Sequence, residues 1–119
     1  NNRALGMVKL EMEVNGLPDN ETDMVNPDFG LIAQAMGFQG INVHKPEEVE
    51  TAIKNAFLHQ GPILLNVFTN PNALAMPPKV AWEQVIGMAK SMTRLMLGGK
   101  MEEVMDTIKS NYKHLKEGL

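Results

Sequence analysis

The sequence contains no cysteine, few aromatic residues and no long hydrophobic run, and each absence narrows the class of protein. Without cysteine, the 119-residue chain forms neither a disulfide nor a thiolate metal site. No apolar stretch approaches the roughly 18 residues of a membrane-spanning helix, and no secretory signal is visible. The net charge of −3 argues against general nucleic-acid binding, which usually needs a basic face.

The residues that are abundant indicate a packed globular domain. Hydrophobic residues make up 44% of the chain and charged residues 21%, which suits one domain or part of one. Ten methionines are present. They are interpreted either as adaptable core filler or as a soft surface that binds lipid or a partner.

The order of the elements predicts an α/β fold. The segment "GINVHK" has the alternation of a strand, residues 46–60 have the pattern of a helix ended by Gly61, and "PILLNVFT" is a second strand buried on both faces. Strand, helix and strand with short connections form a right-handed crossover, typical of a parallel sheet. Two strands are too few for a stable sheet, so the chain is expected to be a fragment of a larger one.

Four further helical features complete the prediction. Leu5, Val8 and Met12 share one face of a first helix, which ends near Gly16. A short helix follows Asp28. The helix over residues 46–60 is expected to bury an apolar stripe, which comprises Val49, Ala52, Ile53, Ala56 and Phe57. Two closing helices, over residues 80–97 and 101–115, are also amphipathic. Their apolar sides comprise Val85, Met88, Ala89, Met92, Leu95 and Met96 in the first, and Met101, Val104, Met105, Ile108, Tyr112 and Leu115 in the second.

Simple catalytic or metal motifs do not emerge from residue spacing. The three histidines, at positions 44, 59 and 114, lie on different elements without ligand spacing, and no phosphate-binding glycine loop is present. Asp19, Glu21 and Asp23 resemble the start of a calcium loop, but the required glycine and distal glutamate do not follow. The residues alone therefore define part of an α/β domain with an amphipathic helical tail.

The ordered segments of the chain resemble thiamine-diphosphate enzymes. In that superfamily a strand ending in Asn-Asn precedes a helix, as "NNRALG" does here. The segment from "NPDFG" to "VFTNP" resembles the cofactor-binding domain of acetolactate synthases and pyruvate oxidases. The stretch "NALAMPPKVAWEQVIGMAKSMTRLML" is similar to the C-terminal region of bacterial pyruvate oxidase or pyruvate:quinone dehydrogenase. The resemblance extends over essentially the whole chain.

The resemblance implies a metal and cofactor site in the first residues. The side chain of Asn2 and the backbone carbonyl of Ala4 would bind Mg²⁺, whose third protein ligand, an aspartate, lies in an upstream segment. The expected cofactor-binding residues are Asn2, Ala4, Leu5, Gly6, Met7 and Val8. Glu11 corresponds to an acidic residue of the substrate pocket; the alternative is an exposed helix carboxylate beside Glu13.

The resemblance also implies a function for the full-length protein. It would decarboxylate pyruvate oxidatively with thiamine diphosphate and Mg²⁺, and would pass electrons through FAD, bound by another domain, to quinone or oxygen. A homotetramer in the cytoplasm, attached peripherally to the inner face of the membrane by its C-terminal helices, is expected; the alternative is that these helices pack on the α/β body. No nucleic-acid partner is expected.

The expected domains are residues 1–78, the C-terminal half of the cofactor-binding domain, and residues 79–119, a helical extension. The fragment alone is expected to be inactive and not to bind thiamine diphosphate measurably. Two rival functions remain open. One is an acetolactate synthase or another thiamine-diphosphate lyase, and the other is a non-catalytic interaction or membrane-binding module.

Overall fold

The computed structural model describes residues 1–75 and 81–117, with side chains described up to residue 112. These residues form two compact units. Unit 1 comprises Asn1–Arg3 and Val25–Thr69, and unit 2 comprises Ala4–Met24 and Asn70–Leu119. The expected domain boundary at residue 78 falls outside the described residues, so it stays a prediction.

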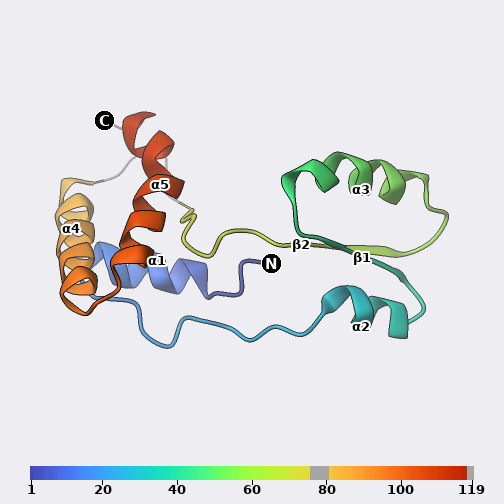
Figure 1. Ribbon diagram of the computed structural model, residues 1–119, viewed down its shortest axis with the longest axis horizontal. Helices are drawn as coiled ribbons and strands as arrows, with labels where there is room; N and C mark the ends of the chain where they lie inside the picture. The colour runs from blue at the N-terminus through green and yellow to red at the C-terminus, as the bar shows by residue number, and fades with distance from the viewer. Residues whose placement is uncertain (76–80, 118–119) are drawn as a thin grey trace. The chain divides into compact units, whose positions relative to one another are not determined.

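Unit 1 is a small α/β arrangement. Strands β1 (Gln39–Val43) and β2 (Ile63–Val67) pair in parallel, from Gln39 beside Ile63 to Val43 beside Val67. Helix α3 (Pro46–Leu58) connects them, and α2 (Phe29–Ala35) precedes β1. The two helices lie on opposite sides of the sheet (Figure 1). The parallel pair and its crossover helix confirm the α/β prediction.

Local chemistry explains where the elements of unit 1 begin. The Asp28 carboxylate accepts a hydrogen bond from the backbone N–H of Leu31 and so caps α2. Helix α3 starts at Pro46, where a missing N–H costs nothing. Helix α2 approaches β1 very closely, since a Cβ added at Gly40 would lie 2.0 Å from the carbonyl oxygen of Gly30. Glycine at this position therefore permits the contact between helix and strand.

The predicted apolar stripe of α3 is mostly not buried. Only Ala52 of that helix is buried, while the side chain of Phe57 is 86% exposed and Ile53 is also exposed. The prediction was wrong here because it assigned burial from helical periodicity alone. Burial also requires a neighbouring element, and the two described strands cover only part of the helix surface.

Unit 2 consists of three helices and the segments that join them. Helices α1 (Gly6–Val14), α4 (Trp82–Leu97) and α5 (Met101–Glu117) match the predicted positions to within a few residues. A cluster of Met92, Leu95 and Val104 forms the apolar core between α4 and α5. Within the described residues, no helix is both long and apolar enough to cross a membrane.

The buried faces in unit 2 are more polar than predicted. In α1 the buried residues are Lys9, Leu10 and Glu13, whereas Leu5 and Val8 are exposed. In α5 the buried residues are Val104, Thr107 and Asn111. The predicted apolar residues that are exposed there are Met101, Met105, Ile108 and Tyr112, and the side chain of Leu115 lies outside the described part. Hydrogen bonds and ion pairs hold these polar side chains inward, and the periodicity of apolar residues does not indicate such burial.

Candidate functional site

Asn1 extends the parallel sheet of unit 1 beside β2. Its backbone nitrogen donates to the carbonyl oxygen of Val67 at 2.7 Å, and the N–H of Thr69 donates to the carbonyl oxygen of Asn1 at 3.1 Å. This alternation is the hydrogen-bond pattern of a parallel ladder. It places Asn1 and Asn2 at the carboxyl end of β2, the edge where open parallel sheets usually bind ligands.

A cleft of about 330 Å³ lies at this edge. Its lining comprises Asn1, Asn2, Asn26, Phe29, Leu64, Leu65, Asn66 and Val67, all in unit 1. The polar side chains in this lining are neutral amides. They would not neutralise a Mg²⁺ ion bound there, so its positive charge could bind an anionic group. Mg²⁺ prefers oxygen ligands, and the amide oxygen of Asn2 is of the right type. The donor chemistry of the cleft therefore fits a magnesium–diphosphate group.

Two side chains stack around Phe68, close to the same edge. The imidazole ring of His44 stacks on the phenyl ring with 4.3 Å between centroids, and the guanidinium carbon of Arg3 lies 5.2 Å from its centroid. Cation–π contacts of this kind hold a guanidinium group close to the surface of an aromatic ring. Arg3 itself has a left-handed backbone, with φ of 52°. The chain thus turns sharply directly after Asn2.

The remaining predicted site residues belong to unit 2. Ala4 forms an antiparallel bridge with Asp23, and the N–H of Leu5 donates to the carbonyl oxygen of Thr22 at 2.8 Å. Helix α1 then begins at Gly6, with Met7 and Val8 exposed on its first turn. Asn2 and these residues lie in different units. Their shared role in one cofactor site therefore stays a prediction.

Glu11 is exposed on α1 and lies in a different setting from its neighbour Glu13. It lines a cleft of about 470 Å³ within unit 2, together with residues of α4 that include Glu83 and Lys90. Glu13, by contrast, is fully buried. The expected role of Glu11 in the substrate pocket is not tested by this geometry and stays a prediction.

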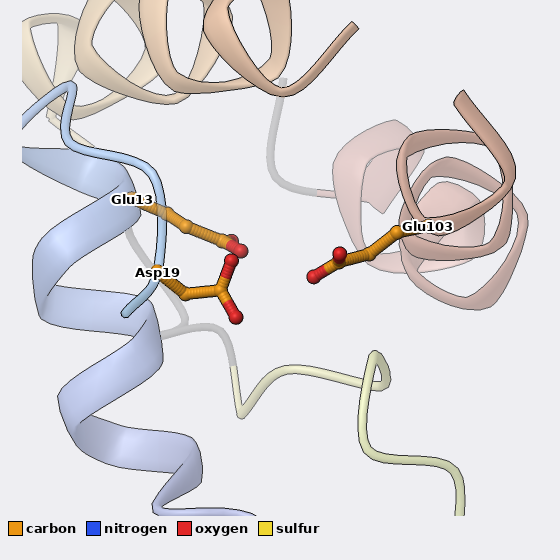
Figure 2. A group of neighbouring side chains, drawn as sticks. All are labelled: Glu13, Asp19 and Glu103. Atoms are coloured by element: carbon orange, nitrogen blue, oxygen red, sulfur yellow. The ribbon is translucent and has the colours of Figure 1, made fainter. Parts of the chain in front are cut away.

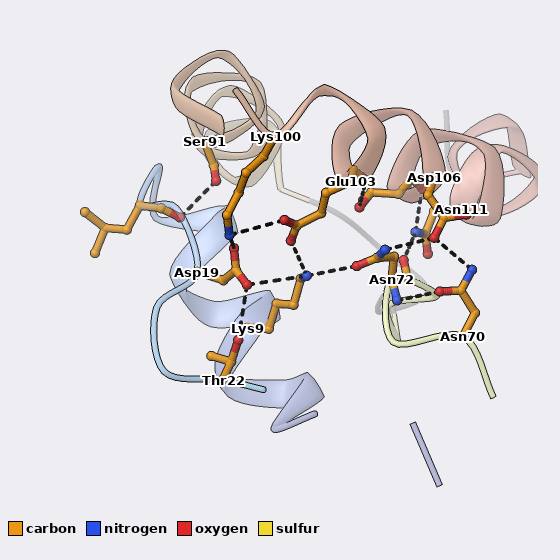
Figure 3. A network of polar contacts seen from close by, with 12 residues as sticks. Lys9, Asp19, Thr22, Asn70, Asn72, Ser91, Lys100, Glu103, Asp106 and Asn111 are labelled. Carbon is orange, nitrogen blue, oxygen red and sulfur yellow. Dashed lines mark hydrogen bonds and ion pairs between the residues drawn. The ribbon is translucent and has the colours of Figure 1, made fainter. Parts of the chain in front are cut away.

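A charged cluster in unit 2 is the feature that sequence reasoning missed. Glu13, Asp19 and Glu103 converge, with one carboxylate oxygen of each within 4.8 Å of the others (Figure 2). Lys9 Nζ lies 2.7 Å from Glu103 Oε1 and 3.5 Å from Asp19 Oδ2. Lys100 Nζ also contacts Glu103 at 3.2 Å and Asp19 at 3.6 Å (Figure 3). Two ammonium groups therefore neutralise two of the three carboxylates.

The third carboxylate of this cluster, Glu13, is neutralised differently. Both of its oxygens are buried and make no hydrogen bond among the described residues. Burial raises the pKa of Glu13 to about 7, despite the opposing charge of Lys9. For Asp19, burial is outweighed by Lys9 and Lys100, which hold its pKa below the ordinary value. A proton on Glu13, which its raised pKa favours below about pH 7, would balance the charge of the cluster.

Comparison with known proteins identifies the family. Residues 1–67 match the family described as thiamine pyrophosphate enzyme, C-terminal TPP-binding domain. The chain therefore belongs to the thiamine-pyrophosphate enzymes, and its first 67 residues lie in their C-terminal cofactor-binding domain. This confirms the predicted superfamily.

Individual relatives extend this result. A Bacillus subtilis protein whose name describes it as thiamine pyrophosphate-containing is 31% identical over 97% of this chain and 20% of its own length. The mitochondrial acetolactate synthase catalytic subunit of Saccharomyces cerevisiae is 36% identical over 49% of this chain and 8% of its own length. The acetolactate synthase large subunit of Porphyra purpurea is 30% identical over 76% of this chain and 16% of its own length. The chain spans a fifth or less of the length of these relatives.

Proposed function

We propose that the protein carrying this chain is a thiamine-diphosphate- and Mg²⁺-dependent enzyme that decarboxylates pyruvate or a related 2-keto acid. The observation that carries the proposal is the placement of Asn2 in a neutral, amide-lined cleft at the carboxyl end of the parallel sheet. When bound, the cofactor supplies the carbon nucleophile and the electron sink for decarboxylation. Within the chain, Asn2 would hold the metal and the exposed first turn of α1 would face the cofactor.

For the fate of the electrons we propose an oxidative reaction, in which FAD bound elsewhere in the protein passes them to quinone or oxygen. The resemblance of residues 72–97 to the pyruvate oxidase group supports this specificity. Acetolactate synthase is the second candidate, favoured by the names of the Saccharomyces and Porphyra relatives. That reaction joins two 2-keto acids and needs no electron acceptor.

One assay on the full-length protein separates these candidates. Pyruvate is supplied with thiamine diphosphate, Mg²⁺ and an artificial electron acceptor, and the products are measured. Acetate formed together with reduced acceptor supports the oxidative proposal, whereas acetolactate formed without acceptor reduction supports the synthase. A protein that binds the cofactor but makes neither product contradicts both reactions, and one that does not bind it contradicts the proposal as a whole.

For the assembly and location we propose a cytoplasmic homotetramer whose α5 contacts a lipid surface on the inner face of the membrane. The exposed row of Met101, Met105, Ile108 and Tyr112 on α5 supports a lipid contact, because such apolar faces bury well at an interface. Light scattering of the full-length protein measures its mass. Sedimentation with anionic vesicles, with and without residues 79–119, tests the lipid contact, and equal sedimentation would contradict it.

A further inference from the structure

A row of four asparagines crosses one face of the sheet in unit 1 and ends on a carboxylate. Asn26 Nδ2 donates to Asn1 Oδ1 at 2.8 Å, and Asn1 Nδ2 donates to Asn66 Oδ1 at 3.0 Å. Asn66 Nδ2 then donates to Asn42 Oδ1 at 2.8 Å. Asn42 Nδ2 finally donates to both carboxylate oxygens of Asp28, at 2.8 Å each. We call these five residues the amide chain.

The carboxylate end gives the amide chain its direction. An ionised carboxylate only accepts hydrogen bonds, whereas each asparagine amide both donates and accepts and can be turned either way. Asn42 must therefore present its Nδ2 to Asp28, which leaves its oxygen for Asn66. For the same reason Asn66 donates its Nδ2 to Asn42, which leaves its oxygen to accept from Asn1 Nδ2. The hydrogen bonds from Asn42 and then from the Leu31 backbone hold the pKa of Asp28 below its ordinary value, so this end stays ionised.

Local packing is adapted to the amide chain. Asn42 and Asn66 are direct neighbours in the register of β1 and β2, and only 5% of the Asn66 residue is exposed. Gly30 leaves room for the Asn42 amide, since a Cβ there would lie 2.7 Å from Asn42 Oδ1. A buried asparagine in an otherwise apolar strand must satisfy its polar atoms. In the part of the chain that the structure describes, the Asn66 side chain does so by linking Asn42 to Asn1.

Asn1, near the other end of the amide chain, forms the turn that encloses Asn2. Because Asn1 Nδ2 is directed to Asn66, Asn1 Oδ1 faces the opposite way and accepts the backbone N–H of Arg3 at 3.3 Å. A side-chain oxygen that bonds the N–H two residues later forms an Asx turn. This turn encloses Asn2 and leads into the left-handed backbone of Arg3. Reversing the Asn1 amide would place a donor against that N–H.

We infer that Asn66, with Asn42 and Asp28, is a positioning residue for the metal ligand Asn2, because the amide chain fixes the Asx turn that encloses Asn2. This inference rests on the proposed function, in which Asn2 binds Mg²⁺. It assigns a role to Asn42 and Asp28, which do not line the cleft, and to Asn66, which lines it and acts on Asn2 through Asn1. Residues that orient metal ligands commonly change metal affinity by about 10- to 100-fold when they are replaced.

The test compares two buried asparagines in the full-length protein. Asn66→Ala breaks the amide chain, and Asn111→Ala is the matched control. Asn111 is 2% exposed and bonds the Leu74 N–H and the carbonyl oxygens of Asn72 and Thr107, all in unit 2. For each variant, titration calorimetry measures the Mg²⁺ dissociation constant at saturating thiamine diphosphate. The melting temperature without cofactor measures the structural damage.

We expect Asn66→Ala to weaken Mg²⁺ binding at least about tenfold. Asn111→Ala should leave the affinity within about twofold although it lowers the melting temperature similarly. Equal losses of affinity in both variants, or none in Asn66→Ala, would overturn the inference. A wild-type protein without Mg²⁺-dependent cofactor binding would overturn the proposed function itself, which distinguishes the two failures.

A second variant keeps the test decisive if Asn66→Ala does not fold. Asp28→Asn retains a good helix cap. It replaces the carboxylate, which only accepts hydrogen bonds, with an amide group that can also donate them. The amides can then reverse their direction. We expect weaker Mg²⁺ binding at an almost unchanged melting temperature, and unchanged affinity in this variant would overturn the directional role of Asp28.

Discussion

The two units bury polar side chains by opposite means. Unit 1 buries Asn66 in a chain of neutral amides, whose single charge lies at the exposed end, on Asp28. Unit 2 buries Lys9 and Glu13 in a charged cluster, whose balance depends on a proton. Neutral amides do not titrate, whereas Glu13, with a pKa of about 7, titrates near neutral pH. The amide side chains that line the cleft of unit 1 therefore carry no charge that changes over the pH range in which Glu13 titrates.

The largest expected effect is the loss of Lys9, which holds the charged cluster together. Lys9→Met leaves the carboxylates of Asp19 and Glu103 with Lys100 alone, and removes the hydrogen bond to Asn72 at 2.9 Å. Breaking a buried ion pair in this way typically costs about 3–5 kcal/mol. Hydrogen exchange, measured by peptide in the full-length protein, should show this loss over residues 101–112. Lys109→Met is the control, because it changes an exposed lysine of α5, the helix in which exchange is measured. Equal effects of the two changes would contradict the role of Lys9.

The pH dependence of unit 2 is the next largest effect. The pKa of Glu13 is raised from 4.5 to about 7, so folding favours the protonated form. The resulting stabilisation is fully present below about pH 4.5 and is lost as the pH rises through about 7, a difference of up to about 3 kcal/mol. Lys9, Lys100, Asp19 and Glu103 are the charged groups that face this carboxyl. Faster exchange over α1 at pH 8 than at pH 6, after correction for intrinsic rates, would show the loss.

Glu13→Gln removes this pH dependence, because the amide is a neutral isostere of the protonated acid. We expect the variant to be more stable than the wild type at pH 8 and similar to it at pH 5. Glu102→Gln, at an exposed position of α5, should keep the wild-type profile. Peptides from residues 39–67 should show no matching pH effect, and a shared effect would remove the contrast between the units.

Each unit also has a close approach that depends on glycine, and the two can be compared. A Cβ at Gly40 would lie 2.0 Å from the Gly30 carbonyl oxygen, and one at Gly87 would lie 1.7 Å from the Val14 carbonyl oxygen. Alanine at either site forces the backbone apart and is expected to cost about 1–3 kcal/mol. Hydrogen exchange should rise only in the unit that carries the change. Gly98→Ala is the control, since its Cβ would make ordinary contacts of 3.4 and 3.5 Å.

The smallest effect is expected at the exposed ion pair of α3. Lys54 Nζ lies 2.6 Å from Glu50 Oε1, but both side chains are mostly exposed. Solvent screens such pairs, so Lys54→Ala should change stability by less than about 0.5 kcal/mol. A larger change in melting temperature than that of Lys9→Met would reverse the ranking of buried and exposed charge.

Much of the architecture follows from local sequence signals. Asp28 and Pro46 mark helix starts, the glycines at 16 and 37 mark helix ends, and the run "ILLNV" marks a buried strand. These signals act within a few residues, so no knowledge of the fold is needed to read them. The role of Asn2 was likewise predicted from its neighbours in the sequence, through the resemblance to a family that the match supports, and it stays a prediction.

The sides on which the helices are buried could not be predicted in the same way. Periodicity predicted burial of Ile53 and Phe57, which are exposed. It gave no sign of the burial of Lys9, Glu13 and Asn111. A lysine or asparagine is stable in the interior only where a distant partner meets it. Glu103 lies 94 residues from Lys9 along the chain, and no local pattern connects them.

The sequence by itself determined the elements, their order, the parallel crossover and the family, because these depend on local preferences and short motifs. Only the tertiary structure decided which polar groups meet, such as Asn1 with Asn66 and Lys9 with Glu103, and which carboxyl group, that of Glu13, is buried with a raised pKa. The physical reason is that the free energy of a buried polar atom depends on its partners in space. For this protein, those partners turn a row of asparagines into a directed chain that includes Asn1, the residue before the proposed metal ligand Asn2.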